Sequence, residues 1–268
     1  MQMYKFVNYR MKKEETINHI VDWIKNYHSQ SRTKGLVIGV SGGIDSALTS
    51  TLAARTNTPV LCIEMPIHQE KNQIDRSKKH IKWLTENFSN VRNIEIDLTE
   101  IYDLFSKTMN LNTNKENSLA LANTRSRLRM TTLYHNAQIN NYLVLGTGNK
   151  VEDFGIGFFT KYGDGGVDIS PIADLMKSEV YQLSKHLKID SEILNAPPTD
   201  GLWGEDLTDE DQIGANYDEL EWAMKYSGNR KNLSIREKEI LEIYENFNQK
   251  NQHKMVEIPV CKIPKRLK

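Results

Sequence analysis

The chain has 268 residues, with 35 lysines and arginines against 35 aspartates and glutamates. This length fits one large α/β domain or two small ones, and the balanced charge argues against a dedicated nucleic-acid partner or an anionic membrane surface. No apolar run approaches the ~18 residues of a membrane helix, and no apolar stretch follows the basic N-terminus as a secretory signal requires, so we expect a cytoplasmic protein.

The first predicted element is an amphipathic helix, in which Ile17, Ile20, Val21 and Ile24 recur at helical spacing. Four apolar runs follow, LVIGV (36–40), VLCIE (60–64), IEIDL (94–98) and YLVLG (142–146), separated by helical segments at 46–55, 74–88 and 118–139. Continuous apolar runs are typical of strands that helices bury on both faces. The alternation therefore predicts an α/β fold with a doubly wound, mostly parallel sheet flanked by helices.

The C-terminal third is predicted to be helical. One helix is expected over 175–187, and Ser234 with Glu237 forms the capping box of another. Residues 200–221 carry nine acidic and no basic side chains, which we interpret as a solvated acidic loop, and the tail after Ile258 as a loose surface end. With no internal repeat or linker, residues 1–268 are predicted to form a single domain.

Cys62 and Cys261 are the two cysteines of the chain. They lie in no CxxC or cysteine–histidine pattern, so neither a disulfide framework nor a zinc site is expected. Cys62 lies in the apolar run VLCIEM and is predicted to be a core residue.

A candidate phosphate loop joins the first strand to the next helix. It consists of Gly39, Val40, Ser41, Gly42, Gly43, Ile44, Asp45 and Ser46. Adjacent glycines let backbone N–H groups converge on an anion at a helix N-terminus, but the pattern is neither a Walker A loop nor a dinucleotide fingerprint. A carboxylate beside phosphates requires a cation between them, so Asp45 predicts magnesium; the alternative is that Asp45 caps the helix.

The SGGIDS string resembles the pyrophosphate loop of the N-type ATP pyrophosphatases, which cleave ATP between the α and β phosphates. Three further segments are similar to motifs of NAD synthetase: NTRSRLRM (123–130), GTGNKVE (146–152) and FFTKYGDGGVD (158–168). The resemblance implies an adenine nucleotide alpha hydrolase-like fold. It covers about residues 14–258 with two departures. GTGNKVED is more like the glutamine-using members, and one extra residue separates Glu152 from FFTKYGD.

The resemblance also implies residue roles. ATP would contact the 39–46 loop, Thr147, Lys177 and Thr199; magnesium would bind Asp45 and Glu152; deamido-NAD would contact Arg127, Lys161, Asp168, His253 and Lys254. Lys177, Asp164 and Thr199 are the candidate catalytic residues, with Asp164 as a proton acceptor.

Two details come from helical geometry. Arg127 shares a face with Asn123 whereas Arg129 points the opposite way, so a single arginine is expected to face the site; by resemblance it is Arg127. Asp174 looks like a helix N-cap, and Lys177 in the first turn then opposes the helix dipole, which a bound anion would offset.

The implied activity is that of a carbon–nitrogen ligase of NAD biosynthesis. Magnesium-ATP adenylates the carboxylate of deamido-NAD, pyrophosphate leaves, and ammonia displaces AMP. The resemblance also implies a homodimer. Ammonia is the expected nitrogen donor because the length leaves no room for a glutaminase domain of ~250 to 300 residues.

Other functions stay open at this point. A separate partner could supply ammonia from glutamine. A GMP-synthetase-like amidating enzyme is another possibility, as is a tRNA-thiolating enzyme, although the latter normally needs a reactive cysteine and a basic surface. A non-catalytic adenine-nucleotide-binding regulator would need the phosphate loop, but not Glu152, Lys161, Asp168 and Lys177 together.

Overall fold

The computed structural model describes residues 11–109, 115–199, 202 and 208–268. Four parallel strands form one sheet in the order β3 (Val91–Glu95), β2 (Val60–Glu64), β1 (Gly35–Gly39) and β4 (Tyr142–Val144). The order reverses between β1 and β4, because the chain builds outward from β1 to β3 and then returns to the other side of β1. Ligands of open parallel sheets bind beyond the carboxyl ends of the strands at such a switch point.

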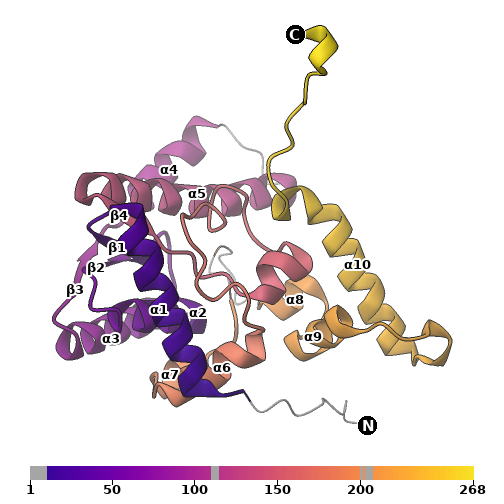
Figure 1. Cartoon of the computed structure of the whole chain (residues 1–268), viewed down its shortest axis with the longest axis horizontal. Helices are drawn as coiled ribbons and strands as arrows, with labels where there is room; N and C mark the ends of the chain where they lie inside the picture. The colour runs from indigo at the N-terminus through magenta and orange to yellow at the C-terminus, as the bar shows by residue number, and fades with distance from the viewer. Residues whose placement is uncertain (1–10, 110–114, 200–201, 203–207) are drawn as a thin grey trace.

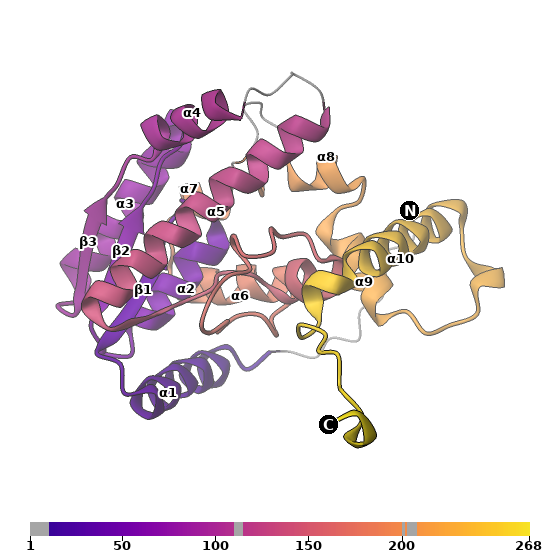
Figure 2. The same cartoon turned by 90° about the horizontal axis from the view of Figure 1, so that it is seen from above.

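Helices cover both faces of the sheet, so the doubly wound prediction is confirmed (Figures 1 and 2). One face packs on α1 (Lys13–Ser31), α2 (Ile44–Ala54), α3 (Lys71–Asn87), α6 (Lys177–His186) and α7 (Ser191–Leu194). The other packs on α4 (Thr99–Thr108) and α5 (Lys115–Asn140). The predicted stripe of α1 is buried, and so is Cys62. The central strands β1 and β2 are therefore buried on both sides, which explains their continuous apolar runs, whereas the edge strand β3 exposes Arg92, Asn93 and Glu95.

Three strands differ from their predicted bounds. The first is shifted by one residue, to Gly35–Gly39. The third begins at Val91 and ends at Glu95, because Asp97 accepts a hydrogen bond from the Thr99 N–H at 2.8 Å and turns the chain into α4. The fourth ends at Val144, and beyond it Leu145 forms an isolated bridge with Ile169.

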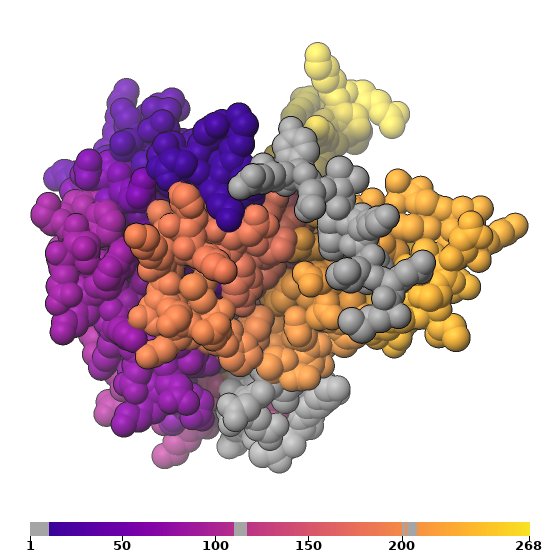
Figure 3. All heavy atoms as spheres, turned by 90° about the horizontal axis from the view of Figure 1, so that it is seen from below, coloured from indigo at the N-terminus to yellow at the C-terminus, as the bar shows by residue number. Residues whose placement is uncertain are grey.

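The C-terminal third contains α8 (Asp209–Ile213), α9 (Tyr217–Lys225), the short turn Arg230–Asn232 and α10 (Ile235–Met255). Ser234 caps α10 as predicted. The interpretation of the acidic segment as a solvated loop is wrong for its described part: 209–213 and 217–225 are helical, and Asp209, Tyr217 and Glu221 are buried. Seen from below, the orange segment with α6 and α7 lies between the purple N-terminal half and the golden C-terminal helices (Figure 3).

The chain after α10 extends away from the body and ends in the short turn Lys265–Leu267 (Figure 1). Its side chains are exposed, as expected of a surface tail. Within the described residues, no helix combines the length and the apolar character needed to cross a membrane.

His80 gives the core a predictable pH dependence. Its Nε2 lies 3.0 Å from the Ser50 hydroxyl and its ring stacks on Trp83, and burial lowers its pKa from 6.5 to about 4. Below pH 6.5 the unfolded chain therefore binds a proton that the folded chain excludes, so the free energy of unfolding decreases as the pH is lowered. This residue should reduce the free energy of unfolding by roughly 2 kcal/mol between pH 6.5 and pH 5. Urea titrations of the wild type and His80→Gln should show a weaker pH dependence in the variant; parallel curves would contradict this.

Candidate active site

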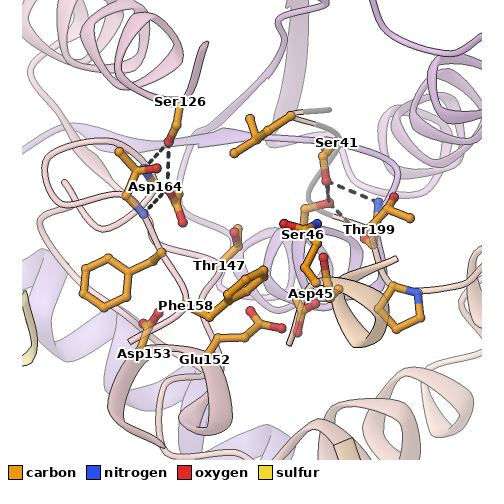
Figure 4. Close-up of a pocket in the computed structure, with 18 of the residues that line it drawn as sticks. Ser41, Asp45, Ser46, Ser126, Thr147, Glu152, Asp153, Phe158, Asp164 and Thr199 are labelled. Carbon is orange, nitrogen blue, oxygen red and sulfur yellow. Dashed lines mark hydrogen bonds between the residues drawn. The ribbon is translucent and has the colours of Figure 1, made fainter. Parts of the chain in front are cut away.

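A cavity of about 530 Å³ opens at the carboxyl ends of β1 and β4. The loops that follow these two strands line it, together with α5, α6, α10 and part of the 158–168 loop. Figure 4 shows Ser41 and Ser46 on one side and Ser126 and Asp164 on the opposite side, with Glu152 between them and Asp153 on the side of Asp164. The structure thus brings a phosphate-loop motif and a substrate-loop motif to one cavity.

Serine hydroxyls hold the phosphate loop (residues 39–46) in shape. Ser46 Oγ donates to the Gly43 carbonyl at 2.9 Å and accepts from the Ser41 N–H at 3.2 Å, while Ser41 Oγ accepts from the Gly43 N–H at 3.3 Å. The N-cap of α2 is Gly43 and no side chain caps it. The alternative that Asp45 is a cap is therefore wrong, and its carboxylate is available for the cavity.

Gly42 and Gly43 differ in what they tolerate. Gly42 has φ +80°, and a Cβ there would lie 2.6 Å from the Gln73 carbonyl oxygen of α3. Gly43 has φ −87°, and its Cβ would meet the Ser41 hydroxyl at 3.3 Å. Gly42→Ala should lower the free energy of unfolding by at least ~1–2 kcal/mol through the left-handed backbone alone. Gly43→Ala should lower the free energy of unfolding by less than half as much. Equal losses of the two variants in urea denaturation would refute the left-handed backbone as the reason for glycine at position 42.

The centre of the cavity is a cluster of one buried lysine and two part-buried carboxylates. Lys177, 3 % exposed, donates to Asp45 Oδ2 at 2.7 Å and to Glu152 Oε1 at 2.9 Å. Asp45 also accepts from the Asn149 amide at 3.1 Å, and Glu152 accepts from the Tyr217 hydroxyl at 2.6 Å. The side chains come from α2, from the segment after β4, from α6 and from α9, so the cluster ties the two halves of the molecule together.

Burial is the largest influence on the pKa of each charged group in this cluster. It leaves the pKa of Asp45 raised. At Glu152 the charge of Lys177 and the hydrogen bonds of Tyr217, Lys177 and Asn149 outweigh burial, so the pKa is lowered. At Lys177 the two carboxylates outweigh burial and raise the pKa. Lys177 is therefore charged at neutral pH, and its anionic partners are side chains of this chain rather than only a bound anion.

Asp174 is not the N-cap of α6. The N-cap is Met176, whose N–H donates to the Glu179 carboxylate at 2.8 Å, while Asp174 makes an exposed ion pair with Lys150. The helix begins two residues later than an N-cap at Asp174 implies. Lys177 is consequently the first residue of α6.

The donor set of the cluster is compatible with magnesium. No group of three or more histidine, cysteine or acidic side chains that could hold a metal occurs in the described parts of the chain. A cation here would therefore take Asp45 and Glu152 and complete its shell with water or substrate phosphate. Magnesium usually binds in this way, through one or two carboxylates and phosphate oxygens.

The 158–168 loop is fixed on α5 and α10. Asp164 Oδ1 accepts from the Ser126 hydroxyl at 2.6 Å and from the Thr160 N–H at 2.9 Å, and burial raises its pKa. Thr160 donates to Asn123 at 2.6 Å. Lys254 donates to the carbonyls of Gly157 and Phe159. Asp164 and Lys254 both line the cavity.

Four predicted substrate residues do not line this cavity: Arg127, Lys161, Asp168 and His253. Arg127, Lys161 and His253 are linked by hydrogen bonds. Arg127 Nε donates to the Lys161 carbonyl at 3.3 Å, and Lys161 Nζ donates to the His253 carbonyl at 2.7 Å. Asp168 accepts from the Tyr134 hydroxyl and the Val144 N–H.

Arg127 was expected to be the arginine that faces the site, but in this structure Arg127 does not line the cavity. Arg129 lines the cavity and donates to Gln69 and the Met65 carbonyl. Asn123 also lines the cavity and contacts the 158–168 loop, whereas Arg127, on the same face of the helix, contacts that loop without lining the cavity.

The remaining predicted ATP residues lie at or next to the cavity. Thr147, Ile44 and Thr199 line it, and Thr199 accepts from Gln73 at 3.0 Å. Gly39 and Val40 line a smaller adjoining pocket with Ser41.

Sequence reasoning missed three residues around Glu152. Asp153 lines the cavity, and burial together with the charges of Glu152 and Asp164 raises its pKa to about 8. Asn149 and Tyr217 bind the carboxylate pair directly. For Asp153 the extra residue after Glu152 was the available signal: Val151–Ile156 forms a π-helix, which accommodates one more residue per turn and is frequent at functional sites.

Known proteins match both the sequence and the fold. The family model described as NAD synthase matches residues 16–258. An NH(3)-dependent NAD(+) synthetase of Mesoplasma florum is 39 % identical over 227 residues, which is 84 % of this chain and 90 % of that protein.

Two solved structures have the same fold. NMN synthetase from Francisella tularensis superimposes with a TM-score of 0.82 at 30 % identity, over 95 % of this chain and 99 % of the other. NH3-dependent NAD synthetase from Campylobacter jejuni, in complex with the nitrate ion, gives 0.76 at 27 % identity, over 94 % and 100 %.

Proposed function

Because the chain belongs to the NAD synthase family, we propose that it uses ATP and ammonia to convert the carboxylate of deamido-NAD into the amide of NAD. The observation that carries the proposal is that the phosphate loop, the Asp45–Lys177–Glu152 cluster and Asp164 all line the same cavity. The family assignment favours this reaction over the GMP-synthetase-like, tRNA-thiolating and non-catalytic alternatives.

The chemistry needs two steps, because a carboxylate is a poor electrophile. A carboxylate oxygen attacks the α-phosphorus, the bond to the bridging oxygen breaks, and pyrophosphate leaves. The N–H groups of the phosphate loop and the Ser41 hydroxyl bind the departing anion. Lys177 stabilises the charge that develops at the α-phosphate. Magnesium, held by Asp45 and Glu152, would neutralise phosphate charge.

In the second step ammonia attacks the acyl carbon and AMP leaves with the former carboxylate oxygen. The nitrogen must lose one proton, and in this proposal Asp164 accepts it. The geometry supports this role, because both hydrogen bonds that its side chain accepts among the described residues go to Oδ1. Asp164→Asn should keep ATP-dependent adenylation and slow amide formation by about 10²–10⁴-fold. Quench-flow measurement of both steps would show this, and an unchanged second step would exclude the role.

The assay of the whole reaction uses magnesium-ATP and deamido-NAD with ammonium or glutamine. We expect NAD with ammonium alone. Formation of NAD with glutamine alone would contradict the proposal that ammonia is the nitrogen donor. Formation of NAD from glutamine only after a glutaminase is added would favour a separate partner that supplies ammonia.

A second candidate substrate is nicotinic acid mononucleotide. It is favoured by the similarity to the Francisella tularensis structure, which is that of an NMN synthetase. Competition between the acid mononucleotide and deamido-NAD in one reaction vessel gives the ratio of their kcat/KM values directly. A ratio above one for deamido-NAD supports the first proposal, and a ratio below one supports the second.

Three further proposals accompany this function. Site residues from 39 to 254 contribute to one cavity or adjoin it, which supports one domain. The family resemblance supports a homodimer, which light scattering tests, and a cytoplasmic location.

A further inference from the structure

Tyr217 is buried against the catalytic cluster, although sequence reasoning gave it no role. It is 6 % exposed and is the first residue of α9. Its hydroxyl lies 2.6 Å from Glu152 Oε1 and 3.1 Å from Asp209 Oδ2, and the Lys177 ammonium lies 4.7 Å from the centre of its ring. One side chain therefore contacts a candidate metal carboxylate and the candidate phosphate lysine.

These contacts restrict Glu152. A glutamate side chain has several rotamers whose loss on burial costs free energy, and the π-helix leaves its backbone without a regular α-helical ladder. Two donors, the Tyr217 hydroxyl and the Lys177 ammonium, converge on Oε1. With Oε1 fixed in this way, the direction of the whole carboxylate is set before any ligand arrives.

The helix that carries Tyr217 is itself held rigidly. Tyr217 packs in an apolar cluster with Ile213, Leu220 and Leu241. One turn later, Glu221 accepts from the Ser178 N–H and hydroxyl, both at 2.8 Å, and so fixes the start of α6 beside Lys177. Through Tyr217 and Glu221, α9 therefore contacts both Glu152 and the start of α6 that carries Lys177.

We propose that Tyr217 is a positioning residue, which orients Glu152 for the cation that accompanies ATP. The inference rests on the proposed function, because Glu152 is a metal ligand only in that proposal. Removing a group that orients a metal ligand typically weakens metal binding by 10- to 100-fold.

The test compares Tyr217→Phe with Tyr244→Phe. The first removes only the hydroxyl. The second makes the same change in a tyrosine packed on the same apolar cluster, and no hydrogen bond of its hydroxyl occurs among the described residues. Manganese binding is followed by electron paramagnetic resonance in the presence of α,β-methylene-ATP. We expect at least tenfold weaker binding in Tyr217→Phe and wild-type binding in Tyr244→Phe, with circular dichroism confirming folded protein.

Activity supplies a second readout. In Tyr217→Phe the magnesium concentration for half-maximal rate should rise about tenfold, while kcat at saturating magnesium stays near wild type. Lower thermal stability with unchanged manganese affinity would show a merely structural role and overturn the proposal. In the Glu152→Gln background, adding Tyr217→Phe should weaken manganese binding by less than a further twofold. A further tenfold loss of manganese affinity would show that Tyr217 acts through another group.

The two proposals fail differently. If wild-type protein with the ATP analogue binds no manganese, the metal role of Glu152 and the inference built on it both fall. If the wild type binds manganese and Tyr217→Phe binds it equally well, only the inference about Tyr217 falls.

Discussion

Replacing Lys177 with methionine is expected to lower kcat/KM by about 10²–10³-fold, the typical cost of removing one group that stabilises transition-state charge. The substitution keeps the unbranched side chain apart from its terminal atom, and removes its charge. Lys185→Met is the matched control, because Lys185 lies on the same helix and is exposed. Steady-state kinetics should show wild-type activity in the control, and wild-type kcat/KM in Lys177→Met would exclude the assigned role.

The same variant should change cation binding in the absence of nucleotide. In the wild type the Lys177 ammonium lies between Asp45 and Glu152, where it opposes a second cation. Without it the two part-buried carboxylates lack their counterion, a loss that costs at most the ~3–5 kcal/mol of stability typical of a fully buried pair. We expect Lys177→Met to be less stable and to bind manganese without ATP more tightly than the wild type. Equal manganese affinities would contradict this electrostatic account.

The second large effect is expected for Asp45→Asn. Asparagine keeps the shape of the side chain but removes one of the two carboxylates available to the cation, and metal stabilisation of phosphate charge is worth several kcal/mol. The rate at fixed magnesium should fall on the order of 10³-fold. Because Lys177 also loses a partner, added magnesium should restore only part of the activity.

Asp174→Asn serves as the control for Asp45. Asp174 was expected to cap the helix that carries Lys177, but its carboxylate is exposed and pairs with Lys150 at the surface. Exposed ion pairs contribute little to stability, so activity and unfolding midpoint should match the wild type. A loss comparable to that of Asp45→Asn would show that Asp174, rather than only the Asp45–Lys177–Glu152 cluster, determines function.

The sheet was predictable because its signal is local. Apolar runs such as VLCIE have few other interpretations, and the order of strands and helices implies a parallel sheet. The strand ends were not, because they depend on single interactions such as the Asp97 turn before α4. The start of α6 was misplaced for the same reason: Glu179 supplies the capping contact in place of Asp174.

The candidate site was predictable where one motif supplies both the loop and its chemistry, as at SGGIDS. It was not predictable where distant segments converge. Nothing local in the acidic segment shows that Tyr217 reaches Glu152, 65 residues earlier in the chain. Arg127 and Arg129 are separable by helical geometry, but which face of α5 meets the cavity depends on the packing of the 158–168 loop.

Isotope transfer tests the central claim most directly. Deamido-NAD labelled with ¹⁸O in the nicotinate carboxylate is turned over with magnesium-ATP and ammonium, and the nucleotide products are analysed by mass spectrometry. Attack of the carboxylate on the α-phosphorus followed by displacement of AMP predicts one ¹⁸O atom in each AMP, and none in pyrophosphate. Label in inorganic phosphate with formation of ADP, or unlabelled AMP, would contradict the acyl-adenylate mechanism and the site assigned to it.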